Sequence, residues 1–322
     1  MAHGAVENGI VGVGGRPVLI TGAHRSGTTW VGATLSAWEG VVYLHEPFNV
    51  DHLYPGMCGA RFPHWFTHIN AANSSRYHED LARMLRWEFS WRDAVSSVRS
   101  VRACIESART ARAFRSARSG HSRPLVKDPI AVFSAEWLAK TFDMDVVMLI
   151  RHPAAFAASL GRLGWRFDFR SFLSQPSLMT ADLAPFAEEI ERAARHPPGF
   201  IEEAALLWRC IYATVYRYGK QHPEWMFLRH EDLSADPESG FQAICQRTGI
   251  PFAGAVAEEL RRNTATDNPV DAPAGATHAL MRNSTAIISR WRQQLDASEI
   301  AEIRASVENV SSRFYSDGEW PE

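Results

Sequence analysis

A glycine-rich turn near the N-terminus limits this chain to a small group of folds. The stretch ITGAHRSGTTWV, at 20–31, places Gly22 and Gly27 at the spacing of the phosphate-binding pattern G-x-x-x-x-G-K-[ST], with Thr29 in the Ser/Thr position. An apolar run precedes this turn and a helical pattern follows it, so the segment predicts a strand, a loop and a helix in succession. The backbone N–H groups of such a loop, together with the N-terminus of the helix, can surround a phosphate group.

One position departs from the phosphate-binding pattern. Thr28 stands where the pattern has a lysine, and Arg25 lies inside the loop, where it restores a positive charge. Ser26, Thr28 and Thr29 add hydroxyl donors. The alternative is a tight strand–helix turn that holds no ligand.

Apolar runs alternate with helical patterns over most of the chain, which is typical of a parallel sheet with helices on both faces. Five runs are interpreted as strands: 16–21, 40–47, 123–129, 144–153 and 224–233. The predicted class is therefore α/β, with a P-loop-containing nucleotide-binding fold and a central parallel sheet of about five strands flanked by helices. Two segments interrupt the alternation, an arginine-rich helical one near 64–122 and an aromatic, proline-punctuated one near 164–199. Both are interpreted as insertions in a single domain that spans 1–322.

Composition sets further limits. A chain of 322 residues that is 46% apolar can bury one large core, and a net charge of -2 gives no argument for nucleic-acid or membrane binding. The chain is too large to need disulfides, and its cysteines, which form no zinc-type pair, are expected to be reduced core thiols. They are Cys58, Cys104, Cys210 and Cys245. Neither a signal peptide nor a membrane span is predicted, so a cytoplasmic location is expected.

Polar or charged residues follow every predicted strand. In an open parallel sheet, ligands bind beyond the carboxyl ends of the strands, so these residues are expected to converge on one crevice. They are the loop at 22–29, then His45 and Glu46, Lys127 and Asp128, Arg151, and finally Arg229 and His230. Their convergence predicts a single site for an anionic ligand.

Several of these segments resemble the sulfotransferases that use 3′-phosphoadenosine 5′-phosphosulfate (PAPS). RSGTTW is similar to the 5′-phosphosulfate loop of that family, and in RHPAAFAAS the residues Arg151 and Ser159 are spaced like the Arg and Ser that hold the 3′-phosphate. Three further stretches resemble segments of the galactose and N-acetylglucosamine sulfotransferases: VVYLHEPFNVDHLYPG, FLRHEDL and ALMRNSTAIISRWRQQLDASEI. LVKDPIAVFSAEWLAKTF is closer to the protein-tyrosine sulfotransferases. The matches span 18–300, and the two insertions have no counterpart.

The resemblance implies transfer of the sulfuryl group from PAPS to an acceptor hydroxyl by in-line displacement. Glu46 matches the catalytic glutamate and is expected to be the general base. His45 is the rival, because its unperturbed pKa near 6.5 is better matched to neutral pH. Lys127 and Arg25 would stabilise the bridging oxygen as 3′-phosphoadenosine 5′-phosphate (PAP) departs. The structural alternatives are a surface glutamate at a turn and a local pair between Lys127 and Asp128.

The nucleotide contacts implied by the resemblance involve the loop, the segment after the fourth strand, and the C-terminal block. They are His24, Arg25, Ser26, Gly27, Thr28, Thr29, Trp30, Arg151, Ser159, Arg229, Arg282, Asn283 and Ser284. Ser284 is alternatively a helix N-cap. Trp30 or Trp291 is placed to stack on adenine, although core packing is the ordinary role of a tryptophan. No metal is expected.

The expected acceptor is a small molecule or a glycan, foremost a sugar hydroxyl, with a lipid, phenol or tyrosine hydroxyl as the alternative. Arginines outnumber acids at 76–123, which indicates either a solvated helix face or a groove for an anionic acceptor. A phosphate-loop kinase is the more distant alternative, because it would need Mg²⁺ ligands and usually the missing lysine. A non-catalytic nucleotide-binding module would not need Glu46 and Lys127 at adjoining strand ends. No nucleic-acid partner is expected.

Overall fold

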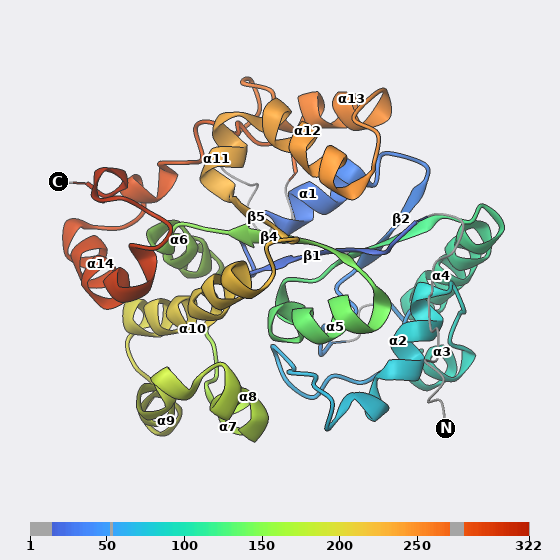
Figure 1. Cartoon of the computed structure of the whole chain (residues 1–322), viewed down its shortest axis with the longest axis horizontal. Helices are drawn as coiled ribbons and strands as arrows, with labels where there is room; N and C mark the ends of the chain where they lie inside the picture. The colour runs from blue at the N-terminus through green and yellow to red at the C-terminus, as the bar shows by residue number, and fades with distance from the viewer. Residues whose placement is uncertain (1–14, 52–53, 271–279, 322) are drawn as a thin grey trace, which may run out of the picture.

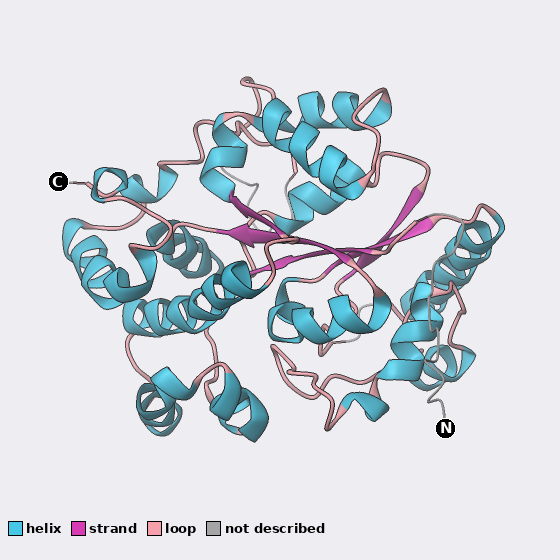
Figure 2. Ribbon diagram, in the orientation of Figure 1, coloured by secondary structure: helices cyan, strands magenta, loops and turns pink. Residues whose placement is uncertain are grey.

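A computed structural model describes residues 15–51, 54–270 and 280–321. Its centre is a five-stranded parallel sheet with the strand order β2-β3-β1-β4-β5 (Figure 2). The strands are β1 (Val18–Gly22), β2 (Val41–His45), β3 (Arg123–Lys127), β4 (Asp145–Ile150) and β5 (Met226–Arg229). The predicted α/β class, with a parallel sheet of five strands, is confirmed.

Helices cover both faces of the sheet (Figure 1). One face is covered by α1 (Thr28–Leu35), α11 (His230–Ala235), α12 (Pro237–Thr248) and α13 (Ala255–Thr264). The other face is covered by α5 (Ala135–Phe142), α6 (Pro153–Leu163), α10 (Phe200–Gln221) and α14 (Ala297–Ser311). The central strand feeds both layers, because Val18 and Ile20 pack into one core cluster and Leu19 into the other. Burial on both faces explains why β1 is apolar throughout rather than alternating.

The remaining helices lie mainly in the two predicted insertions. The first holds η1 (Ser74–Arg76), α2 (His78–Leu85), α3 (Trp91–Ser97) and α4 (Val101–Ser119), and the second holds α7 (Arg170–Leu173), α8 (Pro176–Ala181), η3 (Ala184–Phe186) and α9 (Ala187–Arg195). Three further 3₁₀ turns are η2 (Pro129–Ser134), η4 (Arg290–Gln293) and η5 (Asp317–Glu319).

The two insertions contact each other, although about a hundred residues separate them along the sequence. The backbone N–H of His68 donates to Oε1 of Gln175 at 2.8 Å, and Nε2 of Gln175 donates to the carbonyl of Phe66 at 3.3 Å. The rings of Phe66 and Phe172 lie 6.0 Å apart. These contacts tie the insertions into one layer beside the sheet.

The fifth predicted strand is too long. The run at 224–233 was expected to be extended, but β5 ends at Arg229 and the chain turns into α11 at His230. Glu231 and Asp232 fall in the first turn of α11, where carboxylates are stabilised by the helix dipole. The local preference for a helix start therefore outweighs the apolar pattern.

Asp128 fastens the loop after β2 to the end of β3. Its buried carboxylate accepts hydrogen bonds from the backbone N–H groups of Phe48 at 2.6 Å and Ile130 at 3.1 Å. The backbone N–H of Glu46 also donates to the carbonyl of Lys127 at 2.8 Å. The position of Glu46 at the edge of the sheet therefore depends on buried hydrogen bonds from a neighbouring strand.

Replacing Asp128 by alanine is expected to lower the free energy of unfolding by roughly 2–5 kcal/mol, because two buried N–H groups lose their acceptor. Asp128→Asn keeps one side-chain acceptor oxygen and should lose about half as much. Denaturant unfolding of the three proteins measures both differences. An Asp128→Ala protein as stable as the parent would show that these hydrogen bonds do not hold the loop.

Candidate active site

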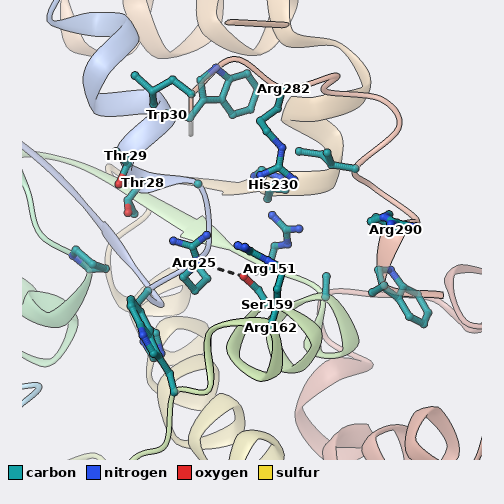
Figure 3. A pocket seen from close by; sticks show the side chains of 18 of the residues that line it. Arg25, Thr28, Thr29, Trp30, Arg151, Ser159, Arg162, His230, Arg282 and Arg290 are labelled. Carbon is teal, nitrogen blue, oxygen red and sulfur yellow. Dashed lines mark hydrogen bonds between the residues drawn. The ribbon is translucent and has the colours of Figure 1, made fainter. Parts of the chain in front are cut away.

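A cavity of about 470 Å³ opens beyond the carboxyl ends of the strands (Figure 3). Its walls come from the loop after β1, the loop after β2, helix α6, the start of α11 and the segment at 280–294. Eleven of the predicted site residues line it: His24, Arg25, Gly27, Thr28, Thr29, Trp30, Glu46, Arg151, Ser159, Arg282 and Ser284. Residues from distant parts of the sequence thus meet at the carboxyl ends of the strands, where the crevice was predicted.

The loop after β1 needs glycine at two positions. A Cβ at Gly22, whose φ is 142°, would lie 2.3 Å from the carbonyl oxygen of Leu149 on β4. A Cβ at Gly27, whose φ is 96°, would lie 2.5 Å from Nδ1 of His230. Gly27 precedes α1 and supplies no side-chain acceptor, so the first N–H groups of α1 can donate to a ligand.

Arg25 projects from this loop into the cavity. Its Nε donates to Oγ of Ser159 at 3.1 Å, and its guanidinium lies 5.9 Å from the ring centre of Trp165 (Figure 3). Burial, followed by the charges of neighbouring arginines, lowers the pKa of Arg25 to about 10. The side chain is therefore still charged at neutral pH.

The charge of the cavity is strongly one-sided. Five arginines line it, and they are Arg25, Arg151, Arg162, Arg282 and Arg290. The acidic residues of the lining are Glu46 and Asp51. Nε of Arg151 lies 3.5 Å from Oε1 of Glu231, which orients that guanidinium from behind. An excess of cations around a partly enclosed space is the electrostatic requirement for binding an anion.

Glu46 forms an ion pair with Lys127 at the edge of the cavity. The fully buried ammonium of Lys127 lies 2.5 Å from Oε1 of Glu46, and Nδ2 of Asn49 donates to Oε2 at 3.0 Å. Burial raises the pKa of Glu46, but the charge and hydrogen bond of Lys127 outweigh it, so the pKa lies below its ordinary value. Glu46 is therefore ionised, and Lys127 pairs with it rather than with Asp128.

His45 points to a different neighbour. Its Nδ1 lies 3.1 Å from the hydroxyl of Tyr43, its ring packs edge-on against Tyr54, and it is absent from the described lining of the cavity. Its Nε2 nevertheless lies 3.7 Å from Oε1 of Glu46. Of the two candidate bases, Glu46 is the one that faces the cavity.

Three predicted nucleotide contacts lie outside the described lining. Arg229 is turned away, since its guanidinium pairs with Asp232 and with Oε1 of Glu319 at 2.8 Å. Asn283 accepts from the N–H of Ala286 and donates to a carbonyl, and Oγ of Ser26 donates to a carbonyl within the loop. Their side chains stabilise turns that carry the neighbouring lining residues.

Ser284 and the two candidate tryptophans, Trp30 and Trp291, have surroundings that the sequence did not specify. Ser284 is buried and lines the cavity, but it begins a series of turns rather than a helix, so the N-cap alternative is wrong. Trp291 stacks on His152 at 4.8 Å. Trp30 packs against His230 and Phe241, and its buried indole N–H has no hydrogen-bond partner in the described part of the chain.

His230 was expected at the crevice but not among the nucleotide contacts, and sequence reasoning gave no role to several other lining residues, among them Arg162, Arg290, Trp65 and Trp165. His230 occupies the place expected for Arg229, and burial lowers its pKa well below the ordinary value, so it is neutral. Arg162 lies three residues after Ser159 on α6, a spacing that puts both on one helix face and that the sequence did contain. The two tryptophans come from the two insertions, which no strand–loop–helix pattern places.

Comparison with known proteins decides the family. The profile of the Sulfotransferase family matches residues 17–254, which is more than half of the chain. The chain belongs to this family. It is accordingly a transferase of sulfuryl groups, and the matched segment includes the loop after β1, Glu46, Lys127 and Arg151.

One solved structure supports the fold assignment. The sulfotransferase domain from the curacin biosynthetic pathway has a TM-score of 0.51 at 10% identity, with coverage of 92% of this chain and 96% of that one. The sulfotransferase domain of the Synechococcus PCC 7002 olefin synthase (TM-score 0.47, 17% identity, 93% and 94% coverage) is also similar. So is a sulfotransferase from Mycobacterium avium (0.46, 12%, 95% and 78%). A sequence comparison with curated proteins gives no match.

No group of three or more His, Cys, Asp or Glu side chains is placed to hold a metal ion in the ranges that the structure describes. No helix within those ranges is long and apolar enough to cross a membrane.

Gly27→Ala is expected to lower the free energy of unfolding by about 1–3 kcal/mol beyond the cost of a positive φ, because the new methyl group overpacks the buried ring of His230. Gly249→Ala is the matched control, since Gly249 also has a positive φ but nothing lies within 4 Å of its Cβ position. Repeating Gly27→Ala in a His230→Ala background should remove most of the excess. An equal cost in both backgrounds would show that His230 does not set the requirement for glycine.

Proposed function

We propose that this protein transfers the sulfuryl group of PAPS to a hydroxyl of an acceptor and releases PAP. The observation that carries the proposal is that two adjoining parts of the cavity offer groups for an anion, and that Arg25 joins them through its hydrogen bond to Ser159. One is the loop at 25–29 with the N-terminus of α1. The other consists of Arg151, which precedes α6, and Ser159, which lies on α6. PAPS carries anionic groups on both sides of its adenosine, whereas the phosphates of ATP lie on one side only.

The donor is proposed to bind across both positions. The loop N–H groups and the hydroxyls of Thr28 and Thr29 would hold the 5′-phosphosulfate, while Arg151 and Ser159 would hold the 3′-phosphate. Arg282 and Ser284 would close over the nucleotide from the C-terminal segment. Trp30 is the candidate for contact with adenine, because it lines the cavity and its buried indole N–H has no hydrogen-bond partner in the described chain.

The transfer step is proposed to be an in-line displacement. The acceptor oxygen forms a bond to sulfur while the bond from sulfur to the bridging oxygen breaks, and the electron pair remains on the 5′-phosphate of PAP. Glu46 takes the acceptor proton. Protonation neutralises Glu46, which is the counter-ion of Lys127. The ammonium of Lys127 is then available to stabilise the developing charge on the leaving oxygen, which Arg25 also faces.

A sugar hydroxyl is the proposed acceptor. The support is the similarity of the segment at 41–56 to carbohydrate sulfotransferases and the presence of Trp65 and Trp165 in the wall, since flat apolar rings suit the face of a sugar. The alternative is a lipid, phenol or tyrosine hydroxyl. Mass spectrometry of extracts incubated with the protein and PAPS, searched for a gain of one sulfate, distinguishes these acceptors.

Binding of PAP should stabilise the protein more than binding of ATP, and chelation of Mg²⁺ should not remove the effect. At a hundredfold excess over Kd, a ligand of the folded state contributes about 2.7 kcal/mol, which is roughly a few degrees in Tm for a chain of this length. Melting with PAP, ADP and ATP, each with and without EDTA, measures the difference. A larger, Mg²⁺-dependent shift from ATP would instead support a kinase.

Glu46→Gln should lower kcat by roughly 10²–10⁴-fold, because the amide keeps the shape of the side chain but cannot accept the proton. PAP affinity should change little. His45→Gln is the matched control and should keep most of the activity, since His45 faces Tyr43. A nearly normal Glu46→Gln enzyme together with an inactive His45→Gln enzyme would reverse the assignment of the base.

A further inference from the structure

Four large apolar side chains are exposed on two consecutive helices. Trp91 and Val95 on α3 are 69% and 76% exposed, and Val101 and Ile105 on α4 are 79% and 47% exposed. We call these four residues the α3–α4 patch. In the described ranges, Met281 is the other large apolar side chain that is exposed to this degree.

Helix geometry gives the patch a defined side. Each pair is spaced four residues apart, so each lies on one face of its helix. The opposite face of α4 is packed against the protein through Phe114 and Ala117, and the opposite face of α3 carries the buried carboxylate of Asp93. The exposed apolar side chains therefore form the outer surface of helices whose inner surface is already buried against the rest of the protein.

Arginines surround the patch. The segment at 91–119 contains seven arginines and two acids, which gives it a net charge of +5 in a chain whose net charge is -2. All seven are exposed: Arg92, Arg99, Arg102, Arg109, Arg112, Arg115 and Arg118. The two acids do not offset this surface, because Asp93 is buried against Arg61 and Glu106 pairs with Arg109 at 2.9 Å.

We propose that the α3–α4 patch binds the surface of membranes that contain anionic lipids. An exposed tryptophan and aliphatic side chains enter the boundary between headgroups and acyl chains, and surrounding arginines contact lipid phosphates. A protein partner would favour an interface core with fewer charges, and a nucleic acid would leave the four apolar side chains without a contact. This proposal does not depend on the transfer reaction.

The patch is fastened to the loop that carries Glu46. The backbone N–H of Gly56 donates to Oδ2 of Asp93 on α3 at 2.6 Å, and the N–H of Ser90 donates to the carbonyl of Gly56 at 2.9 Å. Tyr54, two residues before Gly56, packs edge-on against the ring of His45 at 5.8 Å. Docking through the patch would consequently hold the loop after β2 close to the lipid surface.

Co-sedimentation with vesicles tests the proposal. The protein should bind vesicles that contain phosphatidylglycerol and not vesicles of phosphatidylcholine alone, and high salt should weaken the binding. Each arginine near an anionic surface contributes about fivefold in binding, so Arg102→Gln, Arg112→Gln and Arg115→Gln together should weaken it by roughly a hundredfold. Trp91→Ser with Ile105→Ser should also weaken it, because the apolar contact is lost.

The matched control is a triple variant of exposed arginines elsewhere, Arg192→Gln, Arg195→Gln and Arg247→Gln. It should bind vesicles like the parent protein, and unchanged melting temperatures would show that all variants are folded. Equal binding to both kinds of vesicle, or no binding to either, would overturn the proposal. Patch variants that bind vesicles like the parent, or a control variant that loses as much vesicle binding as the patch variants, would also overturn it. So would binding to DNA that competes with vesicle binding and is not changed by Trp91→Ser and Ile105→Ser.

Discussion

The close passage of the chain at Gly22 beside β4 is the constraint on which the site depends. No side chain fits there, because a Cβ would lie 2.3 Å from the carbonyl oxygen of Leu149. β1 can therefore pair with β3 and β4 up to its last residue and turn directly into the loop that precedes α1. This tight turn aims the N-terminus of α1 at the same edge where β2 delivers Glu46 and β4 delivers Arg151. The position of the glycine loop at this edge therefore follows from one glycine in the central strand.

The electrostatics of the cavity give a physical reason for anion binding. Burial and, after it, the charges of Arg162, Arg151 and Arg282 together lower the pKa of Arg25 to about 10. Cations that disfavour one another's charge in a partly buried space are relieved when an anion enters between them. The charge of Glu46 acts on Arg25 in the opposite direction, but it is the smallest of these effects, and the Glu46 carboxylate also pairs with Lys127. The arginines of the cavity therefore keep an excess of positive charge.

Residues governed by the strand–loop–helix alternation could be predicted from the sequence, and residues governed by packing between distant segments could not. The glycine loop, Glu46 and Arg151 each follow an apolar run, so their common edge was predictable. Arg229 was predicted to contact the nucleotide, but His230 lines the cavity in its place. Which of the two faces the cavity depends on where β5 ends, and a sequence pattern alone specifies the ends of elements poorly. The pairing of Glu46 with Lys127 also depends on strand order, since β2 and β3 become neighbours only in the folded sheet.

The two insertions contribute one wall of the cavity. Trp65 belongs to the first insertion and Trp165 to the second, and their rings lie 6.5 Å apart in an edge-to-face arrangement at the cavity. The hydrogen bonds of Gln175 to the segment at 66–68 hold the two insertions together without using the sheet. Changes in these segments can therefore reshape the wall next to Glu46 while the loop after β1 keeps its geometry. This wall of the cavity is built from the parts of the chain that the parallel sheet does not constrain.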